Sequence, residues 1–304
     1  MIDALEQGRA AYGRRAWRDA YQALSRADHA TALTGDDLER LATAAYLIGH
    51  DIEFLRIVER AHHAYRAAGN TARAARCAFW LGLGLLLRGE TGPATGWLAR
   101  AARLLEQRDC VEQGFLLLPA AEQRLRAGDT ETAHATAARA AAMGDRFGDA
   151  DLSASARHLQ GRSLILQGRV HAGLALLDEA MLAVVVGELS PIMTGLIYCS
   201  VIDACHQVYE MRRAREWTTA LAQWCEQQPE MVAFTGACRV HRAEILQLQG
   251  AWPDALAEAS RARERFDQGE GTSAASAEAL YRQAEMHRLH GDFAAAEEAY
   301  QAAN

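Results

Sequence analysis

One pattern that recurs along this 304-residue chain constrains its fold more than any other feature. In each copy a glycine follows an apolar stretch, with a small residue seven positions before it and an alanine twelve positions after it. The glycines of five copies are Gly89, Gly128, Gly168, Gly250 and Gly291. Gly49 extends the series toward the N-terminus, and Tyr209 takes the glycine position in a degenerate copy. Successive positions are 40, 39, 40, 41, 41 and 41 residues apart, which indicates a repeat architecture.

Each repeat has the pattern of a helical hairpin. The glycine is suited to a left-handed cap that ends the first helix, here called helix A. The small residues allow helix A and the following helix B to approach closely, and stacked hairpins bury one another's faces. Ser190 and Pro191 suit the N-cap and the first position of a helix A. The segment 13–28 matches a helix B. We therefore predict an all-α, right-handed α-solenoid of about eight hairpins, forming one domain over residues 1–304.

Composition excludes several classes of protein. All 32 basic residues are arginines interspersed with 39 acidic residues, and no basic run could follow a phosphate backbone, so we expect no nucleic-acid binding. The chain has neither an apolar run of membrane-spanning length nor a secretion signal, so we expect a cytoplasmic protein without membrane contact. The 6 cysteines show no metal-binding spacing and are expected to be reduced thiols, most of them buried as small apolar residues.

The register of small residue, turn glycine and alanine is similar to the tetratricopeptide repeat, with a longer period than the usual one. The segment 187–259 resembles the repeat region of large actinobacterial LuxR-type transcriptional regulators, and the resemblance covers most of the chain. It implies a protein-interaction or effector-sensing array joined to a DNA-binding or nucleotide-handling domain. The sequence has no Walker motif or helix-turn-helix and stops within an expected helix B, so we expect a fragment of a longer regulator.

The resemblance also implies that helix A lines an inner groove, at positions 2, 5, 9 and 12 when the turn glycine is position 15. In the sixth hairpin this register places Cys199, Asp203 and His206 on one face and turns Cys205 into the hairpin packing. Following the register through the chain gives the candidate ligand or partner residues Glu122, His158, Arg162, Cys199, Asp203, His206, Glu244, Gln247, Tyr281, Glu285 and Arg288.

The predicted groove becomes acidic toward its C-terminal end, where Asp203, Glu244 and Glu285 occupy equivalent positions. Such a ladder suits an extended cationic or amphipathic peptide, or a small effector. The alternative is that these residues are merely solvated polar side chains. We expect no metal and no cofactor, because one helix face supplies at most two neighbouring ligands. The histidine pairs 62/63 and 287/290 are expected to be solvated.

Three functions remain open at this point. The first is a non-catalytic interaction or sensing module of a bacterial regulator, which binds a protein, a peptide or a small effector. The second is an oligomerisation scaffold, for which a homodimer is one arrangement. The third is an enzyme with an enclosed pocket in which Asp203, Glu244 and His206 act as acid and base. We favour the first and expect no catalytic residues, because Cys199 and His206 are two helical turns apart.

Overall fold

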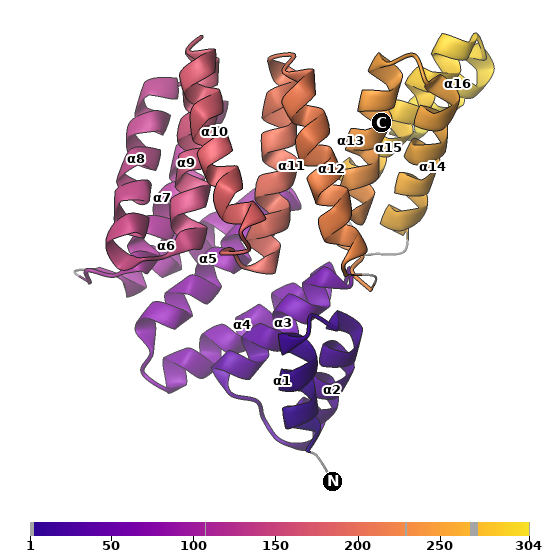
Figure 1. Ribbon diagram of the computed structural model, residues 1–304. Helices are drawn as coiled ribbons and strands as arrows, with labels where there is room; N and C mark the ends of the chain where they lie inside the picture. The colour runs from indigo at the N-terminus through magenta and orange to yellow at the C-terminus, as the bar shows by residue number, and fades with distance from the viewer. Residues whose placement is uncertain (1–2, 107, 229, 268–272, 304) are drawn as a thin grey trace. The chain divides into compact units, whose positions relative to one another are not determined.

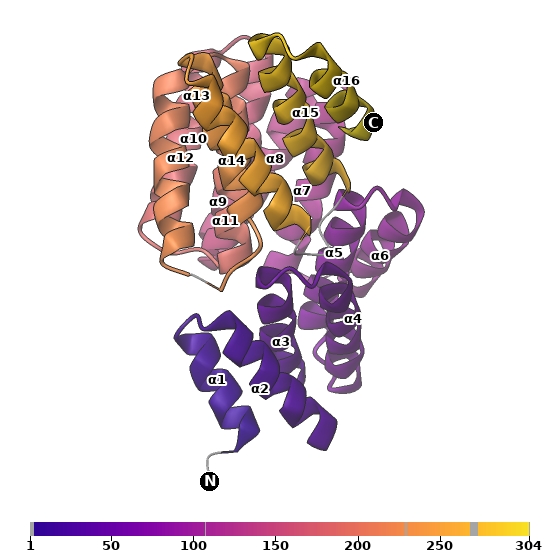
Figure 2. The ribbon, with the colours of Figure 1, turned by 90° about the vertical axis from the view of Figure 1, so that its right-hand side faces the viewer.

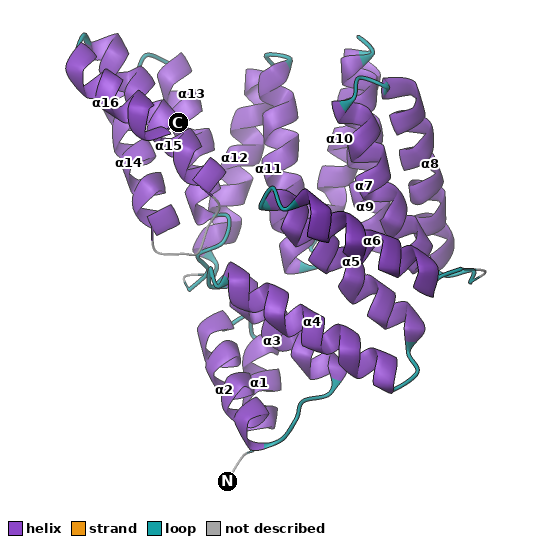
Figure 3. Cartoon of the chain, turned by 180° about the vertical axis from the view of Figure 1, so that it is seen from behind, coloured by secondary structure: helices purple, strands orange, loops and turns teal. Residues whose placement is uncertain are grey.

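The computed structural model describes residues 3–106, 108–228, 230–267 and 273–303, and every regular element among them is a helix (Figure 3). Sixteen helices are assigned within these residues, in the alternating order of helix A and helix B that the repeat predicts (Figure 1). The chain contacts divide it into two compact units, which are described separately below. Unit 1 comprises Met1–Ala32, Arg40–Phe54 and Glu210–Asn304, and unit 2 comprises Leu33–Glu39 and Leu55–Tyr209.

The helices alternate between helix A and helix B along the chain. The first hairpin is α1 (Ala4–Gly13) and α2 (Trp17–Ala30), and the second is α3 (Gly35–Leu47) and α4 (Asp51–Ala67). In unit 2 follow α5 (Thr71–Leu87), α6 (Thr91–Leu104), α7 (Val111–Arg126), α8 (Thr130–Phe147), α9 (Ala150–Leu166), α10 (Val170–Val185) and α11 (Pro191–Gln207). Unit 1 contains α12 (Met211–Glu226), α13 (Thr235–Leu248), α14 (Trp252–Asp267), α15 (Ser273–His290) and α16 (Phe293–Ala303).

The turns within the hairpins confirm the predicted register. All six predicted turn glycines have the positive φ that an L side chain rarely adopts, with values of 87° (Gly49), 77° (Gly89), 79° (Gly128), 79° (Gly168), 77° (Gly250) and 80° (Gly291). Tyr209, at the degenerate position, also has a positive φ of 59°. Its side chain is 83% exposed, so the residue is held there by the turn and not by packing.

The small residues of the register lie where two helices touch. In the α9–α10 hairpin, a Cβ atom added to Gly161 would lie 2.8 Å from the carbonyl oxygen of Gly173. A Cβ atom added to Gly173 would lie 2.6 Å from the carbonyl oxygen of Gly161. The two backbones therefore approach so closely that neither position has room for a side chain, which is the packing that the repeat predicts.

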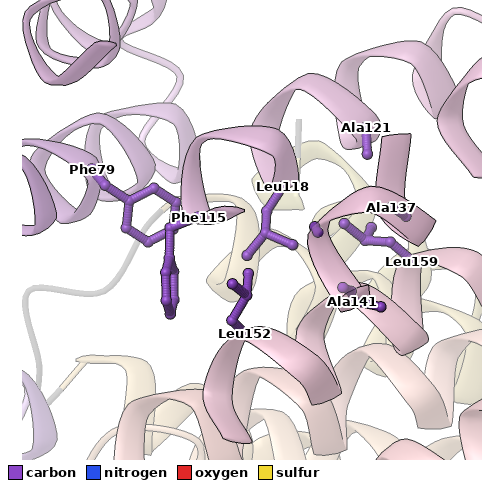
Figure 4. Packing of buried hydrophobic residues seen from close by; sticks show 10 residues of the cluster. Phe79, Phe115, Leu118, Ala121, Ala137, Ala141, Leu152 and Leu159 are labelled. Carbon is purple, nitrogen blue, oxygen red and sulfur yellow. The ribbon is translucent and has the colours of Figure 1, made fainter. Parts of the chain in front are cut away.

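The core of unit 2 continues from one hairpin to the next (Figure 4). Phe79 of α5 and Phe115 of α7 pack edge to face, with ring centroids 5.3 Å apart, and both are fully buried. Leu118 of α7 points toward Leu152 of α9 in the same cluster. Because the cluster draws its members from α5, α7, α8 and α9, consecutive hairpins stabilise one another, as in other helical repeat proteins.

Unit 1 contains two hydrophobic clusters. Ala11, Ala20 and Ala44 pack together where α1, α2 and α3 meet. Val240, Ala262 and Ala279 pack together from α13, α14 and α15, with Phe266 against them. Figure 2 shows α1 beside α2 and α13 beside α14 within this unit.

The connection between α12 and α13 binds to the first two hairpins within unit 1. We call residues 228 and 230–234 the clasp. Trp17 Nε1 donates to Gln228 Oε1 at 3.0 Å, and the backbone N–H groups of Val232 and Ala233 both donate to the carbonyl oxygen of Leu47, at 2.8 and 3.1 Å. This carbonyl belongs to the C-terminal end of α3, where helical carbonyls have no intrahelical donor. The clasp therefore supplies hydrogen-bond donors to the end of a helix more than 180 residues away in the sequence.

Ser190 stands at the N-cap of α11 and Pro191 at its first position, as predicted, although the Ser190 side chain makes no capping hydrogen bond. The Ser190 N–H donates to Asp151 Oδ1 at 2.8 Å. One local prediction is wrong. His62 is not solvated: it is fully buried, and Nδ1 donates to the carbonyl oxygen of Ala74 at 2.7 Å. The periodicity missed this because the ring is covered by the packing of α4 against α5 and by Trp97. Among the described helices, none is both long and apolar enough to cross a membrane.

Candidate functional site

The predicted groove residues are distributed between the two units. Glu122, His158, Arg162, Cys199, Asp203 and His206 belong to unit 2, on α7, α9 and α11. Glu244, Gln247, Tyr281, Glu285 and Arg288 belong to unit 1, on α13 and α15. The third hypothesis, a catalytic set of Asp203, His206 and Glu244, therefore draws on residues of both units.

In unit 2 an ion pair connects two consecutive A helices at the same register position. Arg162 Nη1 of α9 lies 2.6 Å from Glu122 Oε2 of α7, and Arg126 Nε donates to Glu122 Oε1 at 3.0 Å. Burial alone would raise the pKa of Glu122, but the charge of Arg162 and the hydrogen bonds from the two arginines outweigh it and lower the pKa. Both partners of the Arg162–Glu122 pair keep about a quarter of their side-chain surface exposed. A ligand can therefore still reach this pair.

His158 lies one helical turn before Arg162 on α9 and is only 8% exposed. Its Nε2 makes no hydrogen bond among the described residues. Burial lowers the pKa of His158 to about 3; the positive charge of Arg162 adds to this effect, and Glu122 opposes it. The imidazole is therefore neutral at physiological pH, and one ring nitrogen is available to a hydrogen-bonding group of a ligand on this face of α9.

Three residues of the same face were not among the predicted ones. Ser155 lies three residues before His158 on α9, is 6% exposed, and its Oγ has no hydrogen-bond partner in the described structure. Arg76 of α5 stacks on the ring of Phe115, with Cζ 3.5 Å from the ring centroid, and donates to Asp149 Oδ2 at 3.0 Å. All three of Arg76, Phe115 and Ser155 occupy position 2 of the repeat, so following that position along the chain could have found them.

The cluster in segment 199–206 divides as the register predicts. Cys205 is fully buried, whereas Asp203 is exposed and Cys199 and His206 are partly exposed. Because α11 is one continuous helix, Cys199, Asp203 and His206 share a face at intervals of four and three residues. In the part of the chain that the structure describes, no three His, Cys, Asp or Glu side chains come together as a metal ion would require.

In unit 1 the acidic residues of the ladder have arginine partners. Glu244 of α13 forms an ion pair with Arg282 of α15, and His241 Nδ1 lies 3.6 Å from the same carboxylate. Glu285 accepts hydrogen bonds from Arg288 at 3.1 and 2.9 Å, and these lower the pKa of Glu285. The carboxylates are therefore locally compensated, so the strong negative potential that the sequence suggested is reduced here.

The C-terminal hairpin also places two aromatic rings near this ion pair. The ring centroids of Tyr281 and Tyr300 are 5.8 Å apart, and the Tyr300 hydroxyl donates to Glu285. Tyr281 is 43% exposed. An exposed ring beside a charged pair suits contact with a ligand that has both apolar and polar parts.

The arrangement in unit 2 is suited to binding, and less to proton transfer. A histidine with a pKa of about 3 carries no proton to give near neutral pH and accepts one only weakly. Burying polar atoms without partners costs about 1–3 kcal/mol each, so Ser155 Oγ and His158 Nε2 favour a state in which they have a partner. The face therefore offers hydrogen-bonding groups next to the Glu122–Arg162 ion pair.

The sequence matches no protein-family model and no curated protein. Solved structures do resemble the fold. A Rap protein complexed with competence and sporulation factor has a TM-score of 0.56 at 12% identity, with 98% of this chain and 95% of that chain covered. BtubC from P. vanneervenii has a TM-score of 0.54 at 18% identity, with 68% of this chain and 85% of that chain covered.

A third solved structure is a signal transduction ATPase with numerous domains, with a tetratricopeptide repeat sensor, from Pyrococcus horikoshii. It has a TM-score of 0.50 at 11% identity, and the alignment covers 93% of this chain but 43% of that chain. At these identities the similarities show the fold alone. They confirm the predicted class, an all-α solenoid of tetratricopeptide-like hairpins.

Proposed function

We propose that this chain is a non-catalytic sensing module of a bacterial transcriptional regulator of the LuxR type, acting in the cytoplasm. In this proposal residues 1–304 work as one domain, and the inner faces of the A helices bind a peptide or a small effector. The observation that carries the proposal is the Glu122–Arg162 pair beside His158, which links equivalent positions of two consecutive hairpins. A polar cluster that continues from one hairpin to the next suits a ligand that lies across several A helices.

Two of the similar structures support this proposal by what they contain. The Rap protein is complexed with competence and sporulation factor, and its fold matches nearly the whole of this chain. The ATPase carries a tetratricopeptide repeat sensor, and its similarity covers most of this chain. A sensing role also accounts for a face whose buried polar atoms lack partners, because a ligand would supply them.

The chemistry of the face indicates what kind of ligand it takes. Because Glu122, Glu244 and Glu285 all have arginine partners, a purely cationic ligand gains little there. A ligand with both donors and acceptors, such as the backbone of a peptide, can bond to Arg162 and Glu122 together. It can also reach the neutral imidazole of His158.

Binding can be tested without knowing the natural ligand. Peptides selected from a random phage-displayed library on the immobilised chain would be measured by calorimetry against the parent and Arg162→Gln. A hydrogen bond to a charged group contributes about 1.5–3 kcal/mol, so we expect affinity to fall by roughly 10- to 100-fold. The matched control is Arg212→Gln, since Arg212 of α12 is 90% exposed and pairs with Glu216 one turn away. Equal loss in both variants, or no enriched peptide, would contradict the proposal.

One observation favours the scaffold as a second candidate function. Leu182, Val185 and Val186 lie on one face at the C-terminal end of α10, and each is more than half exposed. An apolar face of this kind is typical of an association surface. Val185→Glu would then convert an oligomer to a monomer in light scattering, whereas a parent that is already monomeric at high concentration would exclude this role.

A further inference from the structure

Two buried cysteines stand where α12 ends and α13 begins, in unit 1. Cys225 lies in the last turn of α12, and Cys238 lies in the first turn of α13. They are 9% and 5% exposed, and both are free thiols. The two side chains share a hydrogen bond, although the segment 226–237 separates them in the sequence. The turn between the helices therefore brings the two thiols together.

The surroundings of the pair distinguish Cys238 from buried Cys77 and partly buried Cys110. The hydrogen bond with Cys225 lowers the pKa of Cys238 against the opposing effect of burial, and the nearby His241, Arg242 and Arg239 lower it further. By contrast, burial raises the pKa of Cys77 and of Cys110. Since the thiolate is the reactive form, these surroundings favour Cys238 as the thiol that reacts first.

We propose that Cys225 and Cys238 are an oxidisable thiol pair that closes to a disulfide on reaction with hydrogen peroxide. This modification site uses none of the residues of the proposed binding face, so it is independent of the proposed function. In the first step the Cys238 thiolate attacks one peroxide oxygen, the O–O bond breaks, and Cys238 becomes a sulfenic acid while hydroxide leaves. In the second step the Cys225 sulfur attacks the Cys238 sulfur, the S–S bond forms, and the oxygen leaves as water.

The balance is complete without any other reagent. Two thiols and one hydrogen peroxide give one disulfide and two waters, with two electrons passing from the sulfurs to the peroxide oxygens. The hydroxide of the first step takes the proton that Cys238 released and becomes one water, and the sulfenic hydroxyl leaves with the proton of Cys225 as the other. The two cysteines flank the clasp in the sequence and are buried, so peroxide reaches them only when this segment opens locally.

The disulfide would fix both ends of the segment that holds the clasp. Gln228 and Phe234 lie between the two cysteines, and both contact the first two hairpins: Gln228 through Trp17, and Phe234 through the ring of Tyr46 at a centroid distance of 5.9 Å. Cross-linking a loop of this length stabilises it mainly by restricting its unfolded forms. We therefore expect the oxidised chain to melt about 5 °C higher than the reduced chain.

The test uses the whole chain, reduced and then treated with hydrogen peroxide at a few equivalents. Thiol titration in denaturant should fall from 6 to about four, and peptide mapping without reductant should join the peptides of Cys225 and Cys238. Cys225→Ser should leave Cys238 as a sulfenic acid that a carbon nucleophile such as dimedone traps. The matched control Cys110→Ser removes a thiol at the N-cap of α7, outside the pair and outside the proposed binding face, and should still form the disulfide.

Three results would overturn the proposal. One is an unchanged thiol count after exposure to peroxide. Another is a disulfide that maps to other cysteines, and the third is oxidation of the parent Cys238 to sulfinic acid without a disulfide. If the serine variant does not fold, mapping of the parent chain alone decides between these outcomes. None of them bears on ligand binding by the A helices, which the peptide selection tests separately.

Discussion

Replacing Gly161 with alanine tests the close contact between α9 and α10. The added Cβ would lie 2.8 Å from the carbonyl oxygen of Gly173 and 2.9 Å from Leu177 Cδ2. Leu177 can change its rotamer, but the Gly173 oxygen belongs to the backbone of α10, so the two helices must separate. Overpacking of this kind costs about 1–3 kcal/mol, while the better helix propensity of alanine offsets about 1 kcal/mol. We expect a net loss of up to about 2 kcal/mol in the free energy of unfolding.

The matched control is Gly96→Ala in α6, also a glycine within a helix. A Cβ at Gly96 would meet no heavy atom within 4 Å, so only the helix propensity changes, and the variant should gain up to about 1 kcal/mol. Urea unfolding followed by far-ultraviolet circular dichroism measures both. A loss of stability in Gly161→Ala together with a gain in Gly96→Ala would support the close contact between α9 and α10. If Gly161→Ala is stabilised as much as Gly96→Ala, the small residues of the repeat do not mark the helix contact, and the reasoning fails.

Three further predictions concern single side chains. Gly128→Val should lower the free energy of unfolding by about 1 kcal/mol or more, because φ is 79° and the loss comes from the backbone alone; unfolding in urea at the parent's midpoint would contradict this. Trp17→Phe should cost about 1–3 kcal/mol, since it removes the donor to buried Gln228 Oε1, whereas Trp217→Phe should cost less because Trp217 Nε1 has no partner among the described residues. His158 is neutral when folded and takes a proton when unfolded below about pH 6.5. The free energy of unfolding should therefore fall as pH drops from about 6.5 toward 3, by up to about 1.4 kcal/mol per pH unit. In acid titrations of unfolding, His158→Gln should show a smaller slope than the parent. An equal slope in both would refute the role of burial.

The turns of the hairpins could be predicted from the sequence because they depend on local chemistry. A glycine with positive φ at a fixed spacing from small residues leaves a periodic signal, and even Tyr209 was found by spacing alone. The turns between hairpins were not predicted, although Gly69, Gly148 and Gly187 also have positive φ. These glycines lie 79 and 39 residues apart, close to multiples of the repeat length, but the junctions 31–34 and 227–234 contain no glycine, so the series is incomplete.

For the candidate site, the sequence predicted which residues of one helix share a face, but not their partners on other helices. The register found which residues share a face, such as Cys199, Asp203 and His206. It could not supply the partner of Glu244, because Arg282 comes from the next helix A and the contact depends on how the two helices pack. The environment of His158 was likewise set by tertiary packing.

Contacts between distant parts of the sequence left no local signal. The clasp joins residues about 190 to 210 positions apart, as in the hydrogen bond from Trp17 to Gln228. Cys225 and Cys238 have no recognisable spacing and are brought together by the turn between α12 and α13. Features of this kind follow from the three-dimensional path of the chain, which the periodic pattern does not specify.

Hydrogen exchange with and without a selected peptide tests the proposed binding face most directly. Exchange of backbone amides would be followed by mass spectrometry in the free chain and at saturating peptide. We predict slower exchange in α7, α9 and α11, around Glu122, His158 and Arg162, with little change in the B helices α8 and α10. Protection confined to α8 and α10, with α7, α9 and α11 exchanging as in the free chain, would contradict it.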